Sequence, residues 1–349
     1  MIYLNNYGWN DKLSQLKQES TYNALTHGRI SIVHRTCYEV VSENGLFQCE
    51  LTGNMMYGKS DIELPCTGDW VLFQPFDEHK GIIVDMLPRE RTLYRKKNGT
   101  VADKQAIASY VDKAFIVQSL DDNFNVRRAE RFMVQMQEEN INPVLVFNKA
   151  DLGFDEQKVE EQIRHIARQI PVFFTSIHQP QTILQLRESI SAGETVVFVG
   201  SSGKSSLVNA LCEKSVLLTS DISLSTGKGR HTSTRREMVL MDGSGVLIDT
   251  PGVREFGLAI DDPDSLAEVL EISDYAASCR FKDCKHINEP GCAVLEAVSS
   301  GVLDRKVYES YLKLRREAWH FSTSEYEKRK RDKSFSKLVD EVKKRKANR

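Results

Sequence analysis

A short polar segment, Asn148-Lys-Ala-Asp151, directly follows the apolar run Val144–Phe147. Guanine presents two donors on one edge, and the two oxygens of a carboxylate match them, so Asp151 can accept both. Adenine presents an acceptor at the equivalent ring nitrogen, which would leave the carboxylate unpaired. The stem of Lys149 can lie along the base, while Asn148 braces the loop. The segment therefore indicates a guanine-binding loop, although such polar loops also arise by chance.

A glycine-rich segment follows a second apolar run, Val196–Val199. It comprises Gly200, Ser201, Ser202, Gly203, Lys204, Ser205 and Ser206. In a phosphate-binding loop of this kind, backbone amides bind the phosphates, Lys204 meets the terminal phosphates and Ser205 binds magnesium. The usual form, G-x-x-x-x-G-K-[ST], requires its first glycine at the position of Phe198. The loop is therefore shorter than usual, and an ordinary strand-turn-helix connection has a similar pattern.

Two later segments carry residues that could complete a magnesium and phosphate site. The run Gly227–Thr234 contains hydroxyls, and either Thr232 or Thr234 could bind magnesium. Asp249 ends an apolar run and can hold magnesium through water, while the amide of Gly252 can sense the third phosphate. Taken singly, these segments are also compatible with a flexible loop and a tight turn.

The order of the motifs is more informative than any one of them. Ser176 follows the apolar run Pro171–Phe174. At this position GTPases have a short Ser-Ala loop whose backbone amide meets the guanine oxygen, although Ile177 replaces the alanine here. The chain then continues with the phosphate loop, the threonine-containing run Gly227–Thr234 and the segment Asp249-Thr-Pro-Gly252. The usual GTPase order begins at the phosphate loop, so this is the same order, cyclically shifted. The sequence thus predicts a circularly permuted GTPase domain, and Asp151 disfavours an ATP-dependent enzyme.

A cluster of metal-binding side chains lies near the C-terminal end. It consists of Cys279, Cys284, His286 and Cys292. Three thiolates and one imidazole form a closed tetrahedral set for zinc, with no ligand position left for catalysis. The cluster therefore predicts a structural zinc ion. The alternative is a set of free buried cysteines beside a surface histidine.

The elements that must position the nucleotide motifs are apolar strands alternating with helices between residues 102 and 258. This alternation predicts a mostly parallel sheet covered on both faces, with ligands at the carboxyl ends of its strands. The residues of MVLMDGSGVLID are predicted to form a hairpin. The predicted strands are 113–120, 144–147, 171–174 and 196–199, and the predicted helices are 127–139, 156–169, 181–190 and 204–211.

The flanking regions have different patterns. Residues 28–93 contain short β-rich runs broken by turn residues, which predict a small closed barrel. Its type, oligonucleotide-binding or SH3-like, is left open, and an adaptor barrel without a ligand is a further alternative. From residue 262 the chain is predicted to be helical apart from the cysteine cluster. It ends in a stretch rich in Lys and Arg, which either binds nucleic acid or forms a solvated helix.

The bulk composition limits the class of protein. The chain has 349 residues and a formal net charge of −2, so the total charge identifies no partner. A membrane span needs roughly 18 or more consecutive apolar residues, and no such run occurs. The first residues lack the basic-then-apolar pattern of a signal peptide. We therefore expect a cytoplasmic protein without a membrane partner.

Taken together, the motifs resemble those of the ribosome small subunit-dependent GTPase A family, which are bacterial ribosome-assembly GTPases. The similar segments are GDWV, LPR, NKAD, GKGRHTST, DTPGVREFGL and CRFKDCKHINEPGCAV. The resemblance covers nearly the whole chain and implies a multidomain α/β architecture. It implies an N-terminal OB-fold barrel over residues 1–95, a circularly permuted P-loop GTPase domain over 96–261, and a helical zinc-binding domain with a basic tail over 262–349.

The resemblance also implies an activity. We expect hydrolysis of GTP to GDP and phosphate in late maturation of the small ribosomal subunit, with turnover stimulated by that subunit. The expected partners are GTP and GDP, the small subunit and its rRNA. The expected protein is a monomer that holds one zinc ion and uses magnesium. The expected GTP-binding residues are Asn148, Lys149, Ala150, Asp151, Ser176, Gly200, Ser201, Ser202, Gly203, Lys204, Ser205, Ser206 and Gly252, and the expected magnesium ligands are Ser205, Thr232, Thr234 and Asp249.

Two points about the activity stay open in the sequence. Ras-like enzymes place a glutamine after D-x-x-G, but the position here is Val253, which cannot orient water. The resemblance points instead to His231 as the catalytic residue, and a solvated loop histidine is the alternative. The family form of the phosphate loop contains a further Val-Gly pair. An RNA-binding assembly factor with an impaired nucleotide site is therefore the alternative function.

Overall fold

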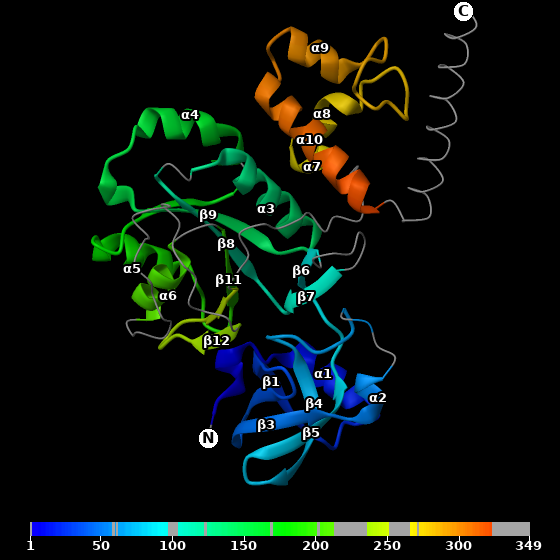
Figure 1. Cartoon of the computed structure of the whole chain (residues 1–349), viewed down its shortest axis with the longest axis vertical. Coiled ribbons are helices and arrows are strands. Elements are labelled where there is room, and N and C mark those ends of the chain that lie inside the picture. The colour runs from blue at the N-terminus through cyan, green and yellow to red at the C-terminus, as the bar shows by residue number, and fades with distance from the viewer. Residues whose placement is uncertain are drawn as a thin grey trace, which may run out of the picture. The chain divides into compact units, whose positions relative to one another are not determined.

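The computed structural model describes residues 2–57, 60, 62–96, 104–121, 124–167, 170–200, 203–212, 236–250, 266–270 and 272–322. The chain divides into two compact units (Figure 1). The first unit comprises residues 1–94 and 105–256, and the second comprises residues 95–104 and 257–349. Barrel and GTPase segments thus share the first unit, and the domain boundaries expected from the sequence stay predictions.

The N-terminal part of the first unit is a closed barrel. Its strands β1, β2 and β3 form an antiparallel meander, β3 runs parallel to β5, and β4 pairs with both β5 and β1. This closure is the five-stranded OB type, one of the two that the sequence left open. The elements of this part are η1 (Leu4–Tyr7), α1 (Asp11–Glu19), β1 (Thr26–Val33), β2 (Tyr38–Ser42), β3 (Gly45–Leu51), α2 (Gly53–Met56), β4 (Trp70–Asp77) and β5 (Lys80–Met86).

A buried ion pair joins Asp69 of the GDWV segment to Arg89 of the LPR segment. The Nε of Arg89 donates to Oδ1 of Asp69 at 2.9 Å, and its Nη2 donates to Oδ2 at 2.6 Å. Asp69 also accepts the N–H of Cys66 at 2.7 Å, and Arg89 donates further to the carbonyls of Ile62 and Leu64. The Asp69 side chain is fully buried, so these bonds compensate a charge that water cannot reach.

Replacing Arg89 by methionine should therefore destabilise the barrel. The buried carboxylate of Asp69 would lose its counter-charge, and we expect the free energy of unfolding to fall by about 3–5 kcal/mol. Urea unfolding followed by tryptophan fluorescence measures the change. Lys80→Met is the matched control, because Lys80 and Asp77 form an exposed pair at 3.8 Å, and its loss should cost less than about 1 kcal/mol. Equal losses in the two variants would contradict the prediction.

The second part of the first unit is the predicted sheet. Its strand order is β10-β9-β8-β11-β13-β12, parallel throughout except that β12 runs antiparallel to β13 in the predicted hairpin. The strands are β8 (Lys113–Ser119), β9 (Asn142–Asn148), β10 (Val172–Thr175), β11 (Thr195–Gly200), β12 (Glu237–Leu240) and β13 (Val246–Asp249). The helical elements are α3 (Val126–Glu138), η2 (Ala150–Leu152), α4 (Glu156–Ala167), α5 (Pro180–Glu188) and α6 (Lys204–Cys212).

Arg29 ties the barrel to this sheet. Its guanidinium donates to the carbonyl of Gly68 and to the hydroxyl of Thr195, both at 2.9 Å, and also to the carbonyl of Tyr7. Complete burial lowers the pKa of Arg29 to about 10, so the group still carries its charge at neutral pH. Strand β1 also pairs with β12, which makes one continuous sheet of the two parts.

The second unit contains short helices and one long helix. A stripe of buried residues on α10, Val307, Tyr311, Leu314 and Ala318, has the spacing of one helical face. Its helices are α7 (Leu266–Val269), α8 (Ser273–Ala276), α9 (Ala293–Ser299) and α10 (Arg305–Ser322). The short strands β6 (Leu93–Lys96) and β7 (Lys104–Ala108), where the chain passes between the two units, pair with each other. Among the described residues, no helix is long and apolar enough to cross a membrane. The basic tail lies outside the described residues.

Candidate guanine-nucleotide site and metal centre

Asn148 links the guanine loop to the phosphate loop. It is the last residue of β9 and is 3% exposed. Its Oδ1 accepts the N–H of Lys149 at 2.8 Å, and its Nδ2 donates to the carbonyl of Gly203 at 3.4 Å. Lys149 adopts the left-handed conformation, with φ of 66°, which turns the chain sharply at the end of the strand. The two loops are therefore held together by one amide side chain.

Asp151, the predicted acceptor for guanine, lies in η2 just after the end of β9. Its Oδ1 accepts the hydroxyl hydrogen of Ser176 at 2.5 Å, and this bond lowers the pKa of Asp151. The carboxylate therefore stays ionised well below neutral pH, and its side chain remains exposed to solvent. The N–H of Ser176 donates to the hydroxyl of Thr182 at 3.0 Å, so this amide is engaged within the protein.

Two glycines of the phosphate loop are required by close contacts. At Gly200, where φ is +126°, a Cβ atom would lie 2.0 Å from the carbonyl oxygen of Val117. At Gly203, where φ is +82°, a Cβ atom would lie 2.5 Å from Nδ2 of Asn148. Any other residue at either position would both strain the backbone and displace its neighbour. Ser201 and Ser202, between them, lie outside the described residues.

Lys204 and the residues after it begin helix α6. The Nζ of Lys204 donates to the carbonyl of Gly200 at 2.8 Å, and the lysine is almost fully buried. Ser205 and Ser206 occupy the first turn of the helix, whose amides favour an anion. Asp249 ends β13, is 2% exposed, and belongs to one of the two strands, β11 and β13, that α6 contacts. His231, Thr232, Thr234 and Gly252 lie outside the described residues.

One residue near the guanine loop was not singled out by the sequence patterns. Asp121 follows the end of β8, and its Oδ2 accepts from Nζ of Lys149 at 2.9 Å. The signal available in the sequence was an acidic residue soon after a predicted strand. Asp121 can reach Lys149 only because β8 lies beside β9, and the local sequence pattern does not specify that pairing.

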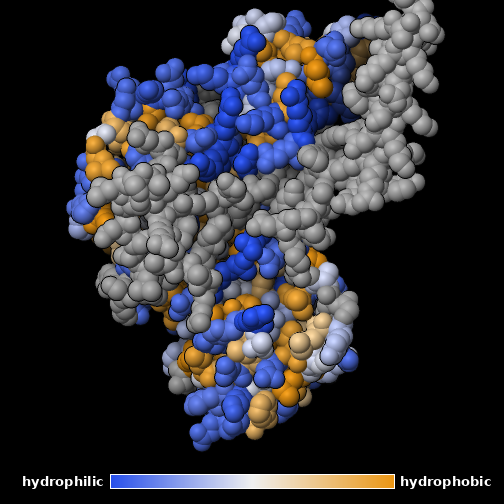
Figure 2. All heavy atoms as spheres, in the orientation of Figure 1, coloured by the Kyte–Doolittle hydropathy of each residue, from blue (hydrophilic) through white to orange (hydrophobic). Residues whose placement is uncertain are grey.

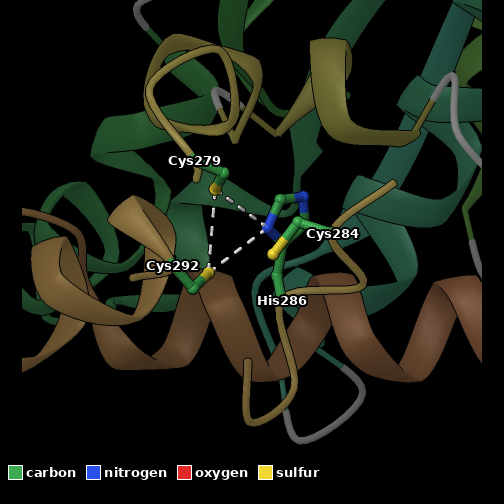
Figure 3. A group of neighbouring side chains, drawn as sticks. All are labelled: Cys279, Cys284, His286 and Cys292. Carbon is green, nitrogen blue, oxygen red and sulfur yellow. Dashed lines mark hydrogen bonds between the residues drawn. The ribbon is translucent and has the colours of Figure 1, made fainter. Parts of the chain in front are cut away.

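The predicted metal ligands converge in the second unit. Figure 3 shows Cys279, Cys284, His286 and Cys292 pointing toward one another. Their ligand atoms all lie within 4.8 Å of one another. Tyr308, on α10, donates a hydrogen bond from its hydroxyl to the carbonyl of His286 at 2.6 Å, which anchors the cluster to that helix.

The spacing of these atoms fits a tetrahedral ion. Sγ of Cys279 lies 3.8 Å from Sγ of Cys292, and the two sulfurs lie 3.5 and 3.4 Å from Nδ1 of His286 (Figure 3). With bonds of about 2.3 Å to sulfur and 2.0–2.1 Å to nitrogen, tetrahedral zinc places two sulfurs about 3.8 Å apart and sulfur about 3.5 Å from nitrogen. The Cys3His cluster is thus compatible with a metal ion, and zinc suits both its atoms and its dimensions.

Glu289 organises the loop that carries the histidine. Its carboxylate accepts the N–H groups of Lys285, Ile287 and Asn288 at 2.9–3.1 Å, and these bonds lower the pKa of Glu289 to about 2. The carboxylate therefore remains a charged acceptor at any pH at which the thiolates can bind a metal. Glu289 therefore fixes the backbone on both sides of His286.

Replacing Glu289 by glutamine should loosen this loop. The amide keeps one acceptor oxygen but loses the charge, and we expect zinc affinity to fall about 10- to 100-fold. Competition with a chromophoric chelator measures the affinity. Glu296→Gln is the matched control, because it changes an acid on α9 that binds none of the loop amides at Lys285, Ile287 and Asn288. Equal zinc affinity in the Glu289 variant and the unaltered protein would rule out the positioning role.

The sheet order and the motif order together define the class of protein. The strand that precedes the phosphate loop, β11, lies at the centre of the sheet, yet the guanine strand β9 precedes it in the chain. A GTPase domain whose guanine motif comes before its phosphate loop is circularly permuted. A solved structure titled "The crystal structure of YloQ, a circularly permuted GTPase" has the same fold, with a TM-score of 0.62 over 88% of this chain and 99% of that one, at 22% identity.

The comparisons with known proteins then give the family. The model of the RsgA GTPase family matches residues 86–259. The chain is 79% identical to "Small ribosomal subunit biogenesis GTPase RsgA 1" of Bacteroides thetaiotaomicron over 98% of this chain and 97% of the relative. It is 38% identical to a protein named RsgA from Methanosarcina acetivorans, over 88% and 83% of the two chains. The crystal structure of YjeQ from Thermotoga maritima matches with a TM-score of 0.62 and 27% identity, over 84% and 98%. The chain belongs to the RsgA GTPase family.

Proposed function

We propose that the protein binds GTP and GDP at the permuted site, hydrolyses GTP, and acts in the biogenesis of the small ribosomal subunit. The observation that carries this proposal is the pair of links between its loops. Ser176 holds the Asp151 carboxylate, and Asn148 joins the guanine loop to Gly203 of the phosphate loop. The relatives are named GTPases, so an RNA-binding factor with an impaired nucleotide site is the less favoured function.

Each site residue has a role in this proposal. Asp151 accepts the two donors of guanine, and Lys149 covers the base with its stem. The amides from Gly200 to Ser206 bind phosphates, and Lys204 neutralises their charge. Ser205 and Asp249, with Thr232 or Thr234, would hold magnesium, which lowers the charge on the phosphates. His231 would orient the attacking water, and the amide of Gly252 would contact the third phosphate.

The second unit has a structural role in this proposal. The Cys3His cluster would hold one zinc ion, which uses all four ligand positions and fixes the loop between α8 and α9. Three basic residues of this loop, Arg280, Lys282 and Lys285, would face phosphates of the RNA. Arg280 also lies 5.5 Å from the ring centre of Phe281, which places a cation beside an exposed aromatic side chain.

The barrel offers a second surface for RNA. The exposed apolar side chains Leu46, Phe76 and Ile82 lie on β3, β4 and β5, and Figure 2 shows apolar residues among hydrophilic ones over this part of the molecule. Apolar and aromatic side chains on an OB-type barrel can pack against unpaired bases. The small subunit and its rRNA are thus the proposed partners of a monomer, and the proposed compartment is the cytoplasm, where subunits are assembled.

Stimulated GTP hydrolysis tests this function. Phosphate release is measured with the full chain alone, with purified small subunits and with purified large subunits. We expect a stimulation of more than about tenfold by small subunits, because the binding of a partner can gate turnover. Large subunits should give none. A rate unchanged by small subunits would contradict the proposal.

A further inference from the structure

The carboxylate of Asp121 lies in contact with the lysine of the guanine loop. Its Oδ2 accepts from Nζ of Lys149 at 2.9 Å and from the hydroxyl of Ser119 at 2.7 Å. The side chains of Asp121 and Lys149 are each 25% exposed, so the pair is largely shielded from solvent. Shielding and a second hydrogen bond distinguish this pair from the exposed ion pairs that contribute little.

The backbone around this pair is fixed on both sides. The N–H of Leu120 donates to the carbonyl of Asn148 at 3.0 Å, which joins the end of β8 to the end of β9. The N–H of Lys149 donates to Oδ1 of Asn148, and the same side chain reaches Gly203. Asp121 therefore contacts the guanine loop through a lysine whose main chain cannot rotate freely.

We propose that Asp121 is a positioning residue for nucleotide binding. It holds the ammonium of Lys149 at the end of β8, so that the four-carbon stem stays extended beside the loop that carries Asp151. The inference rests on the proposed guanine site, because the stem is useful only where a base lies against it. A free lysine side chain samples many rotamers, and restricting it before the nucleotide arrives reduces the entropy lost on binding.

A competing role for the same contact predicts the opposite effect. Were the ion pair to withdraw Lys149 from the nucleotide, removing Asp121 would release the lysine and tighten binding. Were Asp121 only to stabilise the turn after β8, its removal would weaken binding whether or not Lys149 is present. The roles differ in whether removing Asp121 weakens or tightens nucleotide binding, and in whether that effect requires Lys149. One set of variants therefore separates them.

A double-mutant cycle tests the inference on the full, zinc-loaded chain. Dissociation constants for GDP with magnesium are measured by calorimetry for the unaltered protein, Asp121→Ala, Lys149→Ala and the double variant. We expect Asp121→Ala to weaken binding about fivefold to tenfold, and to have no further effect once Lys149 is alanine. Ser119→Ala removes the second hydrogen bond and keeps the ion pair, so it should weaken binding less than Asp121→Ala does.

The outcomes are distinct. Unchanged or tighter binding by Asp121→Ala overturns the inference, and so does an equal loss in the presence and absence of Lys149. Asp151→Asn reports on the proposed function itself. If the unaltered chain binds GDP and Asp151→Asn does not, the guanine site stands, and the cycle decides Asp121 alone. No GDP binding by the folded, unaltered chain overturns both.

Discussion

The Asp151→Asn variant is expected to bind GDP about 10³-fold more weakly than the unaltered protein, because two donors of guanine lose their charged acceptor. The same variant should gain affinity for xanthosine diphosphate. Xanthine carries an oxygen where guanine carries its amino group, and the side-chain amide of asparagine can donate to that oxygen. Competition against a fluorescent nucleotide measures both affinities in one titration.

The control for this exchange lies four residues further along. Asp155→Asn makes the same chemical change at an acid whose Oδ1 accepts the N–H of Lys158 at the start of α4. Asparagine caps a helix about as well as aspartate, so this variant should bind GDP normally. An Asp151→Asn variant that retained full GDP affinity, with none for xanthosine diphosphate, would show that Asp151 does not contact the base.

The Cys292→Ala variant is expected to lose both its zinc ion and the fold of the second unit. Cys292 is buried, is one of the four side chains of the Cys3His cluster, and directly precedes α9. Zinc contributes about 10–16 kcal/mol to the folding of small zinc domains, so removing a ligand removes much of that free energy. Metal content measured by a chelating dye should fall from one zinc per chain to near zero, with a loss of helical circular dichroism.

A second cysteine variant separates metal binding from general damage. Cys37 lies in the first unit, where its sulfur accepts from Nε2 of Gln48, and it belongs to no metal cluster among the described residues. Cys37→Ala should keep one zinc ion and the same circular dichroism. Retention of a full complement of zinc by Cys292→Ala would mean that the cluster is not the metal site.

The positions of the candidate site residues at strand ends could be predicted where they depend on local sequence pattern. Asn148 and Asp249 end apolar runs, and each is the last residue of a strand of the parallel sheet. The sequence could indicate the Cys3His cluster because its four side chains lie in one short loop, and the structure brings their ligand atoms within 4.8 Å of one another. The fold class is confirmed for the same reason, since the alternation of strands and helices is itself local.

The parts that the sequence did not predict depend on contacts between distant segments. The barrel type was left open because it is decided by the pairing of β3 with β5 and of β4 with β1. The partner of Arg89 lies 20 residues earlier in the chain, and Asp121 meets Lys149 across 28 residues. Nothing in the composition of either segment specifies its partner, because such pairing is set by strand order.

Magnesium-dependent nucleotide binding by the unaltered, zinc-loaded chain is the most direct test of the guanine site and its short phosphate loop. Calorimetry would be run with GTP, GDP and ATP under the same conditions. We expect GTP and GDP to bind in the micromolar range and ATP to bind at least about 100-fold more weakly, because adenine leaves the carboxylate of Asp151 unpaired. Absence of GTP and GDP binding in a folded sample, or equal binding of ATP, would contradict the assignment of a guanine-nucleotide site.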